Sequence, residues 1–125
     1  MLENEISSQV IGAAIEVHKH LGPGLLESSY EACLLYELKK QGLEVKSQVI
    51  LPIHYKGVQL DAGYRLDILV ESRLILEIKS VEKLEGIHTA QLLTYLRLTK
   101  LKLGLLINFN SVKLIDGVKR VVNNL

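Results

Sequence analysis

The sequence predicts a single α/β domain of 125 residues in which helices flank a mixed β-sheet. Three observations predict this class. Apolar residues recur at helical spacing in the first third of the chain, alternate with polar residues in the middle third, and form an aliphatic run behind a further helix near the end. We therefore expect the element order ααβββαββ, with helices covering both faces of the sheet.

The first third of the chain has the pattern of two helices separated by a break. Apolar stripes at helical spacing mark residues 4–20 and residues 26–41. The glycines and the proline of residues 21–24 separate the two stripes, because these residues interrupt helices. Gly42 is expected to end the second helix.

Two strands follow. Residues 43–55 and 58–70 alternate between apolar and polar side chains, as half-buried strands do. Lys56-Gly57 is expected to form the hairpin turn between them. Pro52 indicates an edge position or a bulge in the first strand, and Ala62-Gly63 indicates a bend in the second.

The rest of the chain predicts a helix and further strands. The helix spans residues 87–99, and the aliphatic segment 102–109 behind it is typical of a strand buried on both faces. A right-handed crossover would place this segment parallel to the strand at residues 74–79. A short strand at 112–115 is expected next, and residues 118–124 are either a fraying tail or a further edge strand.

The register of the central hairpin decides where the polar side chains of its two strands meet. A two-residue loop would place Asp67 and Glu77 on opposite faces of the sheet. A three-residue loop over residues 71–73 sets them directly opposite each other on one face. The segment has no Asn-Gly or Asp-Gly pair of the kind that favours tight two-residue turns, so we predict the longer loop. Lys79 then emerges beside Glu77.

Two carboxylates and a lysine converge in this register. Carboxylates about 5 Å apart repel each other unless a cation or a shared proton neutralises them. Oxygen ligands suit Mg²⁺, Mn²⁺ or Ca²⁺, and the chain has no cluster of His and Cys that suggests zinc. A lysine beside such a cation can orient a water nucleophile or stabilise charge on a phosphate. The alternative is an ordinary exposed salt bridge between Lys79 and the acids.

Three motifs in one order extend this interpretation. Asp67, followed ten residues later by Glu77-Ile78-Lys79, resembles the signature of the PD-(D/E)xK nuclease superfamily, although Leu66 stands at the proline position. Upstream, Gly24-Leu25-Leu26-Glu27-Ser28-Ser29-Tyr30 matches the motif of the GxxExxY proteins, a small group placed in that superfamily. Downstream, Gln91-Leu92-Leu93-Thr94-Tyr95 is similar to the QxxxY element of its RecB-like branch.

The resemblance covers residues 6 to 122 and implies a restriction-endonuclease-like fold and a Mg²⁺-dependent nuclease, with Mn²⁺ as a substitute. The implied metal ligands are Glu27, Asp67, Glu77 and the backbone carbonyl of Ile78. The implied catalytic residues are Asp67, Glu77, Lys79, Gln91 and Tyr95. Lys79 would hold or deprotonate the attacking water, and Gln91 and Tyr95 would position the lysine, a water or the nucleic-acid backbone.

Two further residues are candidate substrate contacts. Arg65 shares a strand face with Asp67 and could contact a phosphate. Tyr30 belongs to the GxxExxY motif, although a tyrosine on the apolar side of a helix is more often a packing residue with a hydrogen-bonding hydroxyl.

Composition excludes some other classes and leaves the partner open. The net charge of +1 argues neither for nor against nucleic acid. Cys33 is the only cysteine, so an intrachain disulfide is impossible. The sequence shows neither a signal peptide nor the roughly 18 consecutive apolar residues of a membrane span. We expect a cytoplasmic protein that acts on nucleic acid, DNA in the first place, and homodimerisation would enlarge its binding surface. The alternative is a catalytically silent nucleic-acid- or protein-binding module on the same fold.

Overall fold

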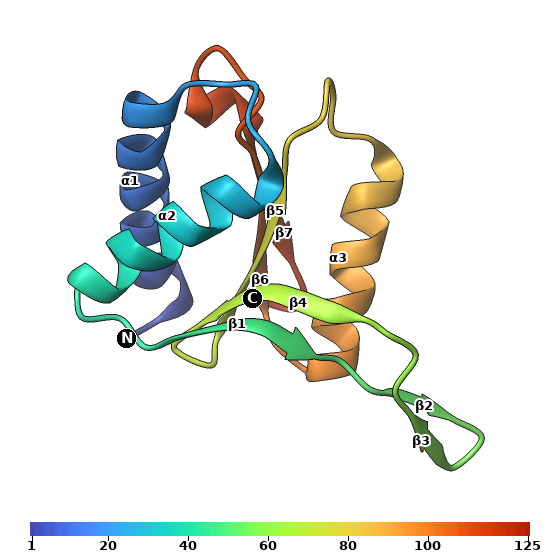
Figure 1. Cartoon of the computed structure of the whole chain (residues 1–125). Coiled ribbons are helices and arrows are strands. Elements are labelled where there is room, and N and C mark those ends of the chain that lie inside the picture. The colour runs from blue at the N-terminus through green and yellow to red at the C-terminus, as the bar shows by residue number, and fades with distance from the viewer.

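A five-stranded sheet in the order β1-β4-β5-β6-β7 forms the centre of the structure (Figure 1). The computed structural model describes every residue from Met1 to Leu125. The strands of this sheet are β1 (Val45–Ile50), β4 (Arg65–Val70), β5 (Leu74–Lys79), β6 (Leu103–Asn108) and β7 (Val118–Val122). The helices are α1 (Glu3–Leu21), α2 (Glu27–Lys40) and α3 (Gly86–Thr99). The predicted mixed α/β class is confirmed.

The sheet is mixed because of a single crossover. β1 and β4, β4 and β5, and β6 and β7 are antiparallel pairs, whereas β5 and β6 are parallel. α3 connects the two parallel strands, as a parallel connection requires a crossover. The predicted parallel pairing of the aliphatic segment with β5 is therefore confirmed, from Leu74 opposite Leu103 to Lys79 opposite Asn108.

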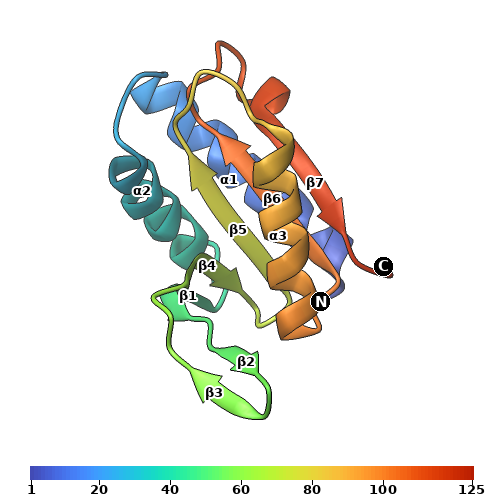
Figure 2. The same ribbon diagram turned by 90° about the vertical axis from the view of Figure 1, so that its right-hand side faces the viewer.

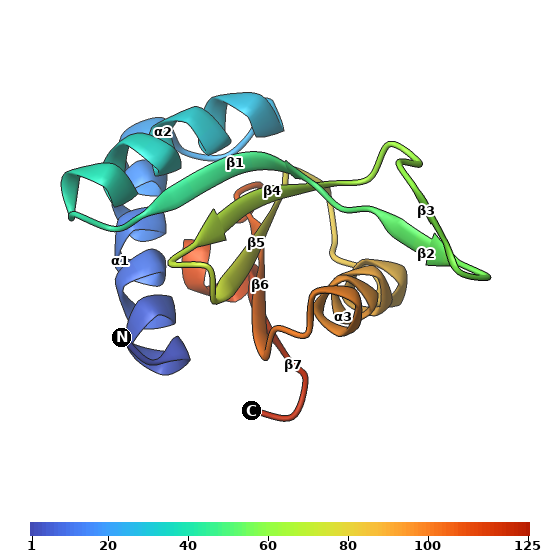
Figure 3. The same ribbon diagram turned by 90° about the horizontal axis from the view of Figure 1, so that it is seen from below.

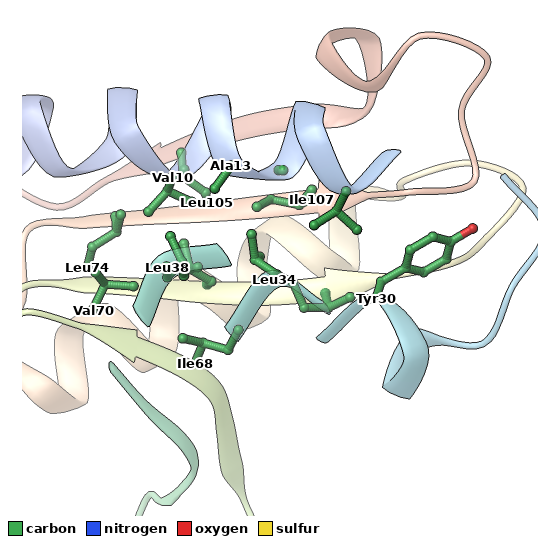
Figure 4. Packing of buried hydrophobic residues seen from close by; sticks show 14 of the residues in the cluster. Val10, Ala13, Tyr30, Leu34, Leu38, Ile68, Val70, Leu74, Leu105 and Ile107 are labelled. Atoms are coloured by element: carbon green, nitrogen blue, oxygen red, sulfur yellow. The ribbon is translucent and has the colours of Figure 1, made fainter. Parts of the chain in front are cut away.

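Helices cover both faces of the sheet, as predicted (Figures 1 and 3). α1 and α2 lie on one side, and their buried stripes pack with β4, β5 and β6 in a core of 19 residues. Figure 4 shows part of this core, with Val10 of α1, Leu34 and Leu38 of α2 and Leu105 of β6 among its labelled residues. α3 covers the other face with a smaller core of eight residues. All six residues of β6 are buried, as expected of a strand that helices cover on both sides.

Each of the two long predicted strands is divided in the structure. The first breaks at Leu51-Pro52 and the second between Asp61 and Tyr64. Their outer parts, β2 (Ile53–Tyr55) and β3 (Val58–Leu60), form a separate hairpin that projects from the body of the molecule (Figures 2 and 3). Pro52 has no N–H to donate to a ladder, which explains the first break. The predicted turn at Lys56-Gly57 is confirmed.

The predicted strand at residues 112–115 is wrong. The chain forms a 3₁₀ helix, η1 (Leu114–Gly117), and the edge strand β7 follows it. Val112 is 92% exposed, and only Leu114 of this segment reaches the core. A single apolar anchor is enough for a tight helical turn but not for an alternating strand. None of the three α-helices combines the length and the apolar content needed to cross a membrane.

Candidate active site

The turn between β4 and β5 sets the geometry of the site. Val70 pairs with Leu74, so three residues, 71–73, form the loop. Glu71 and Ser72 both adopt a left-handed φ of 53°, and the Arg73 N–H donates to the Val70 carbonyl over 3.0 Å. The ladder continues to the pair Ile68–Leu76, and the next residues in this register are Asp67 and Glu77. The predicted three-residue register is therefore confirmed.

Beyond this last ladder pair, the two acids take over the hydrogen bonding between the strands. The backbone N–H of Asp67 donates to Oε2 of Glu77 over 2.9 Å. In return, the backbone N–H of Ile78 donates to Oδ2 of Asp67 over 2.7 Å. Each carboxylate is thus bound to the strand of the other, and the two are held side by side between β4 and β5.

Burial makes this pair of acids electrostatically costly. Glu77 is only 5% exposed, and burial together with the charge of Asp67 raises its pKa to about 8. Burial also raises the pKa of Asp67, while the Ile78 N–H and the Lys79 ammonium act in the opposite direction. Two such carboxylates cannot both ionise at neutral pH without a compensating positive charge. Lys79 is the nearby cation within the chain, and a bound metal ion would be a second one.

The first turn of α2 brings Glu27 to the end of β5. Its Oε1 accepts a hydrogen bond from the Ser80 N–H over 3.2 Å. The Ser80 hydroxyl donates to the Leu25 carbonyl over 2.7 Å, so the loop before α2 is also attached to this point. The charge of Glu27 also contributes, as the smallest of several causes, to the raised pKa of Asp67.

Tyr30 is a packing and hydrogen-bonding residue, and its side chain is not in a position to make the predicted substrate contact. Its ring is fully buried and stacks on Phe109 with centroids 4.5 Å apart. Its hydroxyl donates to the Gly22 carbonyl over 2.6 Å and accepts from the Leu25 N–H over 3.1 Å. The tyrosine of the GxxExxY motif therefore fixes the loop that precedes Glu27, and no surface of the ring is left for a ligand.

The chain beyond Lys79 is equally constrained. The Phe109 N–H donates to the Lys79 carbonyl over 3.0 Å. The buried Asn108 side chain accepts from the Val81 N–H over 3.1 Å and donates to the Val81 carbonyl over 2.9 Å. β6 therefore fixes the end of β5 and with it the backbone that carries Lys79.

α3 brings Tyr95 to the acid pair and leaves Gln91 on its outer side. Burial and the charge of Glu77 raise the pKa of the Tyr95 phenol, and its ring meets Tyr64 edge-on at 6.2 Å. Gln91 is exposed and lines an open pocket. The other residues that line this pocket are Ile53, Tyr64, Ile87, Thr94, Tyr95 and Leu98. Gln91 thus lies next to Tyr95 in this pocket and makes no hydrogen bond to the acids.

Arg65 lies at the start of β4 in an exposed ion pair. Its guanidinium donates to the Asp61 carboxylate over 3.1 Å. An exposed pair of this kind is weak, because solvent screens it. The guanidinium is therefore free to exchange Asp61 for another anion at low cost.

Sequence reasoning missed two residues beside the site, Glu31 and Gln48. The Gln48 amide donates to Oε1 and Oε2 of Glu31 over 2.9 and 3.2 Å. The signal for Glu31 was its position one helical turn after Glu27. Gln48 could not be singled out from the sequence, because its left-handed φ of 51° inside β1 is unexpected for a residue other than glycine. Such a conformation costs on the order of 1–3 kcal/mol for a residue other than glycine, and inside a strand no turn accounts for it.

The donor set of the pair fits a hard divalent cation. Oε2 of Glu77 accepts the Asp67 N–H, whereas Oε1 accepts no hydrogen bond within the chain, so this oxygen is available to a ligand. Asp67 adds a second carboxylate, and oxygen donors are those that Mg²⁺ prefers. No three side chains of His, Cys, Asp and Glu lie close enough together to hold a metal ion by themselves. The structure thus provides a two-carboxylate centre, with Glu27 held against Ser80 beside it.

Comparison with known families gives the class of this domain. A family model described as the PD-(D/E)XK nuclease superfamily matches residues 4–121. The chain therefore belongs to the PD-(D/E)XK nuclease superfamily, and its mixed sheet with flanking helices agrees with the restriction-endonuclease-like fold. No curated protein and no solved structure matches the chain.

The buried hydroxyl of Tyr30 leads to a first prediction. Tyr30→Phe keeps the stacked ring but leaves the Gly22 carbonyl and the Leu25 N–H without their partner. We expect the free energy of unfolding to fall by about 1–3 kcal/mol. Tyr36→Phe on the exposed side of the same helix is the control and should change it by less than about 0.5 kcal/mol. Denaturant unfolding measures both, and equal stabilities would contradict the assigned role.

The raised pKa of Glu77 leads to a second prediction. Between its ordinary value of 4.5 and about 8, the folded protein keeps a proton on Glu77 that the unfolded chain releases. Stability in EDTA should therefore fall as the pH rises through this range, by on the order of a few kcal/mol. The shifts of Asp67 and Glu31 act in the same direction.

Glu77→Gln has no proton to release and should lose most of this pH dependence, which denaturant unfolding at both ends of the range would measure. Glu37→Gln, farther along α2, serves as the matched control and should keep it. The same pH dependence in the wild type and in Glu77→Gln would contradict the assignment of the buried proton to Glu77.

Proposed function

We propose that the chain is a Mg²⁺-dependent nuclease that hydrolyses phosphodiester bonds in nucleic acid, DNA in the first place. The observation that carries this proposal is the pair of the half-buried Asp67 and the buried Glu77 between β4 and β5, with Lys79 on the same strand as Glu77. A soluble domain has little reason to bury two repelling carboxylates unless a cation compensates them in the working state. Membership of a nuclease superfamily supports the same reaction class.

Asp67 and Glu77 would hold the metal ion in this proposal, with the backbone carbonyl of Ile78 and, directly or through a water, Glu27 as further ligands and Mn²⁺ as a substitute. When bound, the ion supplies the positive charge that polarises a phosphoryl oxygen. Lys79 holds the attacking water and helps to remove its proton. The fixed end of β5 keeps the lysine amine in place for this task.

Residues on the α3 side and at the start of β4 bind the nucleic acid. Arg65 contacts a phosphate after releasing Asp61. The pocket that Gln91, Tyr64 and Tyr95 line receives the nucleotide next to the scissile phosphate, because the exposed ring of Tyr64 offers a stacking surface there and the charge of Glu77 acts on Tyr95. This use of Gln91 and Tyr95 is the basis for placing the chain in the RecB-like branch.

Three further assignments complete the proposal. The chain is one of the GxxExxY proteins in this proposal, and the Gly24–Tyr30 motif with the loop that Tyr30 fixes supports this assignment. Residues 1–125 act as one nuclease-like domain, which works in the cytoplasm. A homodimer would extend the small surface available for a duplex, and the exposed apolar side chains of the β2–β3 hairpin, Tyr55, Val58 and Leu60, are candidates for its interface.

A third prediction tests the nuclease proposal. Lys79→Ala should fold and bind the metal ion normally but lose cleavage by about 10²-fold or more, because the lysine acts on the water and not on the ion. The assay incubates the protein with single-stranded, duplex and branched DNA and with RNA, in Mg²⁺ or Mn²⁺. Lys119→Ala, on the exposed edge strand β7, is the matched control.

Cleavage by Lys79→Ala at the wild-type rate would overturn the proposed mechanism. Metal-dependent cleavage that disappears in Asp67→Ala would support the nuclease. Binding of nucleic acid by the wild type without any cleavage would support the silent binding module instead.

A further inference from the structure

β1 contains a backbone irregularity at the point nearest the acid pair. β1 and β4 keep one register throughout, and in this register Gln48 lies opposite Asp67. The pairs on either side, Ser47–Ile68 and Val49–Leu66, are formed, but the pair between them is not. Gln48 is also the only residue of β1 with a left-handed φ. The strand is therefore distorted at one residue without any shift of its register.

The distorted residue makes a directed contact. The Gln48 amide donates to both carboxylate oxygens of Glu31, over 2.9 and 3.2 Å. Glu31 lies one helical turn after Glu27 on α2, so both acids project from the same side of that helix. Gln48 thereby links the second turn of α2 to the edge of the sheet beside Asp67.

Glu31 belongs to the electrostatic environment of the acid pair. Burial raises its pKa, and the charges of Asp67 and Glu27 act in the same direction, while the Gln48 amide opposes them. A hydrogen bond between exposed polar groups offers little stability in return for a strained backbone, so stability alone does not explain this arrangement.

We propose that Gln48 is a positioning residue that holds the Glu31 carboxylate against Asp67, so that Glu31 contributes to divalent-cation binding at the Asp67–Glu77 centre. This inference rests on the proposed function. Glu31 acts as a supporting acceptor beside the ligands, and Gln48 acts through Glu31. Residues that orient metal ligands in this way typically change metal affinity about 10–100-fold when they are removed.

The test measures Mn²⁺ binding by calorimetry and unfolding in EDTA by denaturant. Gln48→Asn and Gln48→Gly tolerate the left-handed backbone but cannot reach Glu31, whereas Gln48→Ala keeps the strain and loses the amide. We expect the Mn²⁺ dissociation constant to rise about tenfold in all three variants and in Glu31→Gln. The double variant Glu31→Gln/Gln48→Asn should lose no more affinity than Glu31→Gln alone.

Gln48→Asn and Gln48→Gly should be at least as stable as the wild type in EDTA, which separates a positioning role from a structural one. Gln59→Ala on β3 and Glu37→Gln on α2 are the matched controls and should bind Mn²⁺ like the wild type. Three results would overturn the inference: unchanged Mn²⁺ affinity in Gln48→Asn, independent losses that multiply in the double variant, or equal losses of affinity and stability. A wild type that binds no Mn²⁺ would overturn the proposed function as well, whereas the other results leave that function intact.

Discussion

The reciprocal hydrogen bonding of Asp67 and Glu77 is the constraint on which the rest of the site depends. Each carboxylate accepts an N–H from the neighbouring strand, so neither can move away from the other without losing a bond between β4 and β5. The sheet thereby holds two repelling groups together. Burial and the charge of Asp67 both raise the pKa of Glu77, because they disfavour its ionised form. A divalent cation bound between the two carboxylates would offset this unfavourable energy.

The elements around the pair hold it from three directions. Tyr30 fixes the loop before α2, and Glu27 is the first residue of the helix after that loop. Asn108 fixes the chain that leaves β5, so hydrogen bonds hold the segment directly after Lys79. On the opposite face, α3 supplies Tyr95. Because these supports come from rigid elements and not from long loops, the site is held in place before any ligand binds.

Much of this arrangement could be predicted from the sequence, because the spacing of apolar residues and the length of a turn can be read from neighbouring residues. The choice between two registers of the central hairpin depended on one loop, and residues 71–73 form that loop as predicted. The division of the two long predicted strands could be anticipated only in part, from Pro52 in the first of them. The segment at residues 112–115 was misjudged because its apolar residues looked like a strand, although only Leu114 packs inside.

The remaining part of the site depends on contacts between distant segments, which a single sequence does not display. Gln48 looks like any polar residue of an alternating strand, and only the structure shows its left-handed backbone and its contact with Glu31. The role of Tyr30 was open for the same reason, since Phe109 is far away in the chain. The roles of such residues can be assigned only when the packing and the hydrogen bonds of the folded chain are known.

Anomalous diffraction from crystals grown with Mn²⁺ tests the central claim most directly. The account predicts one strong peak between the carboxylates of Asp67 and Glu77, with an oxygen of each at about 2.0–2.2 Å, as expected for small divalent ions with oxygen ligands. No peak at this position under saturating Mn²⁺, with the two carboxylates still bound to the backbone N–H groups of Ile78 and Asp67, would contradict it.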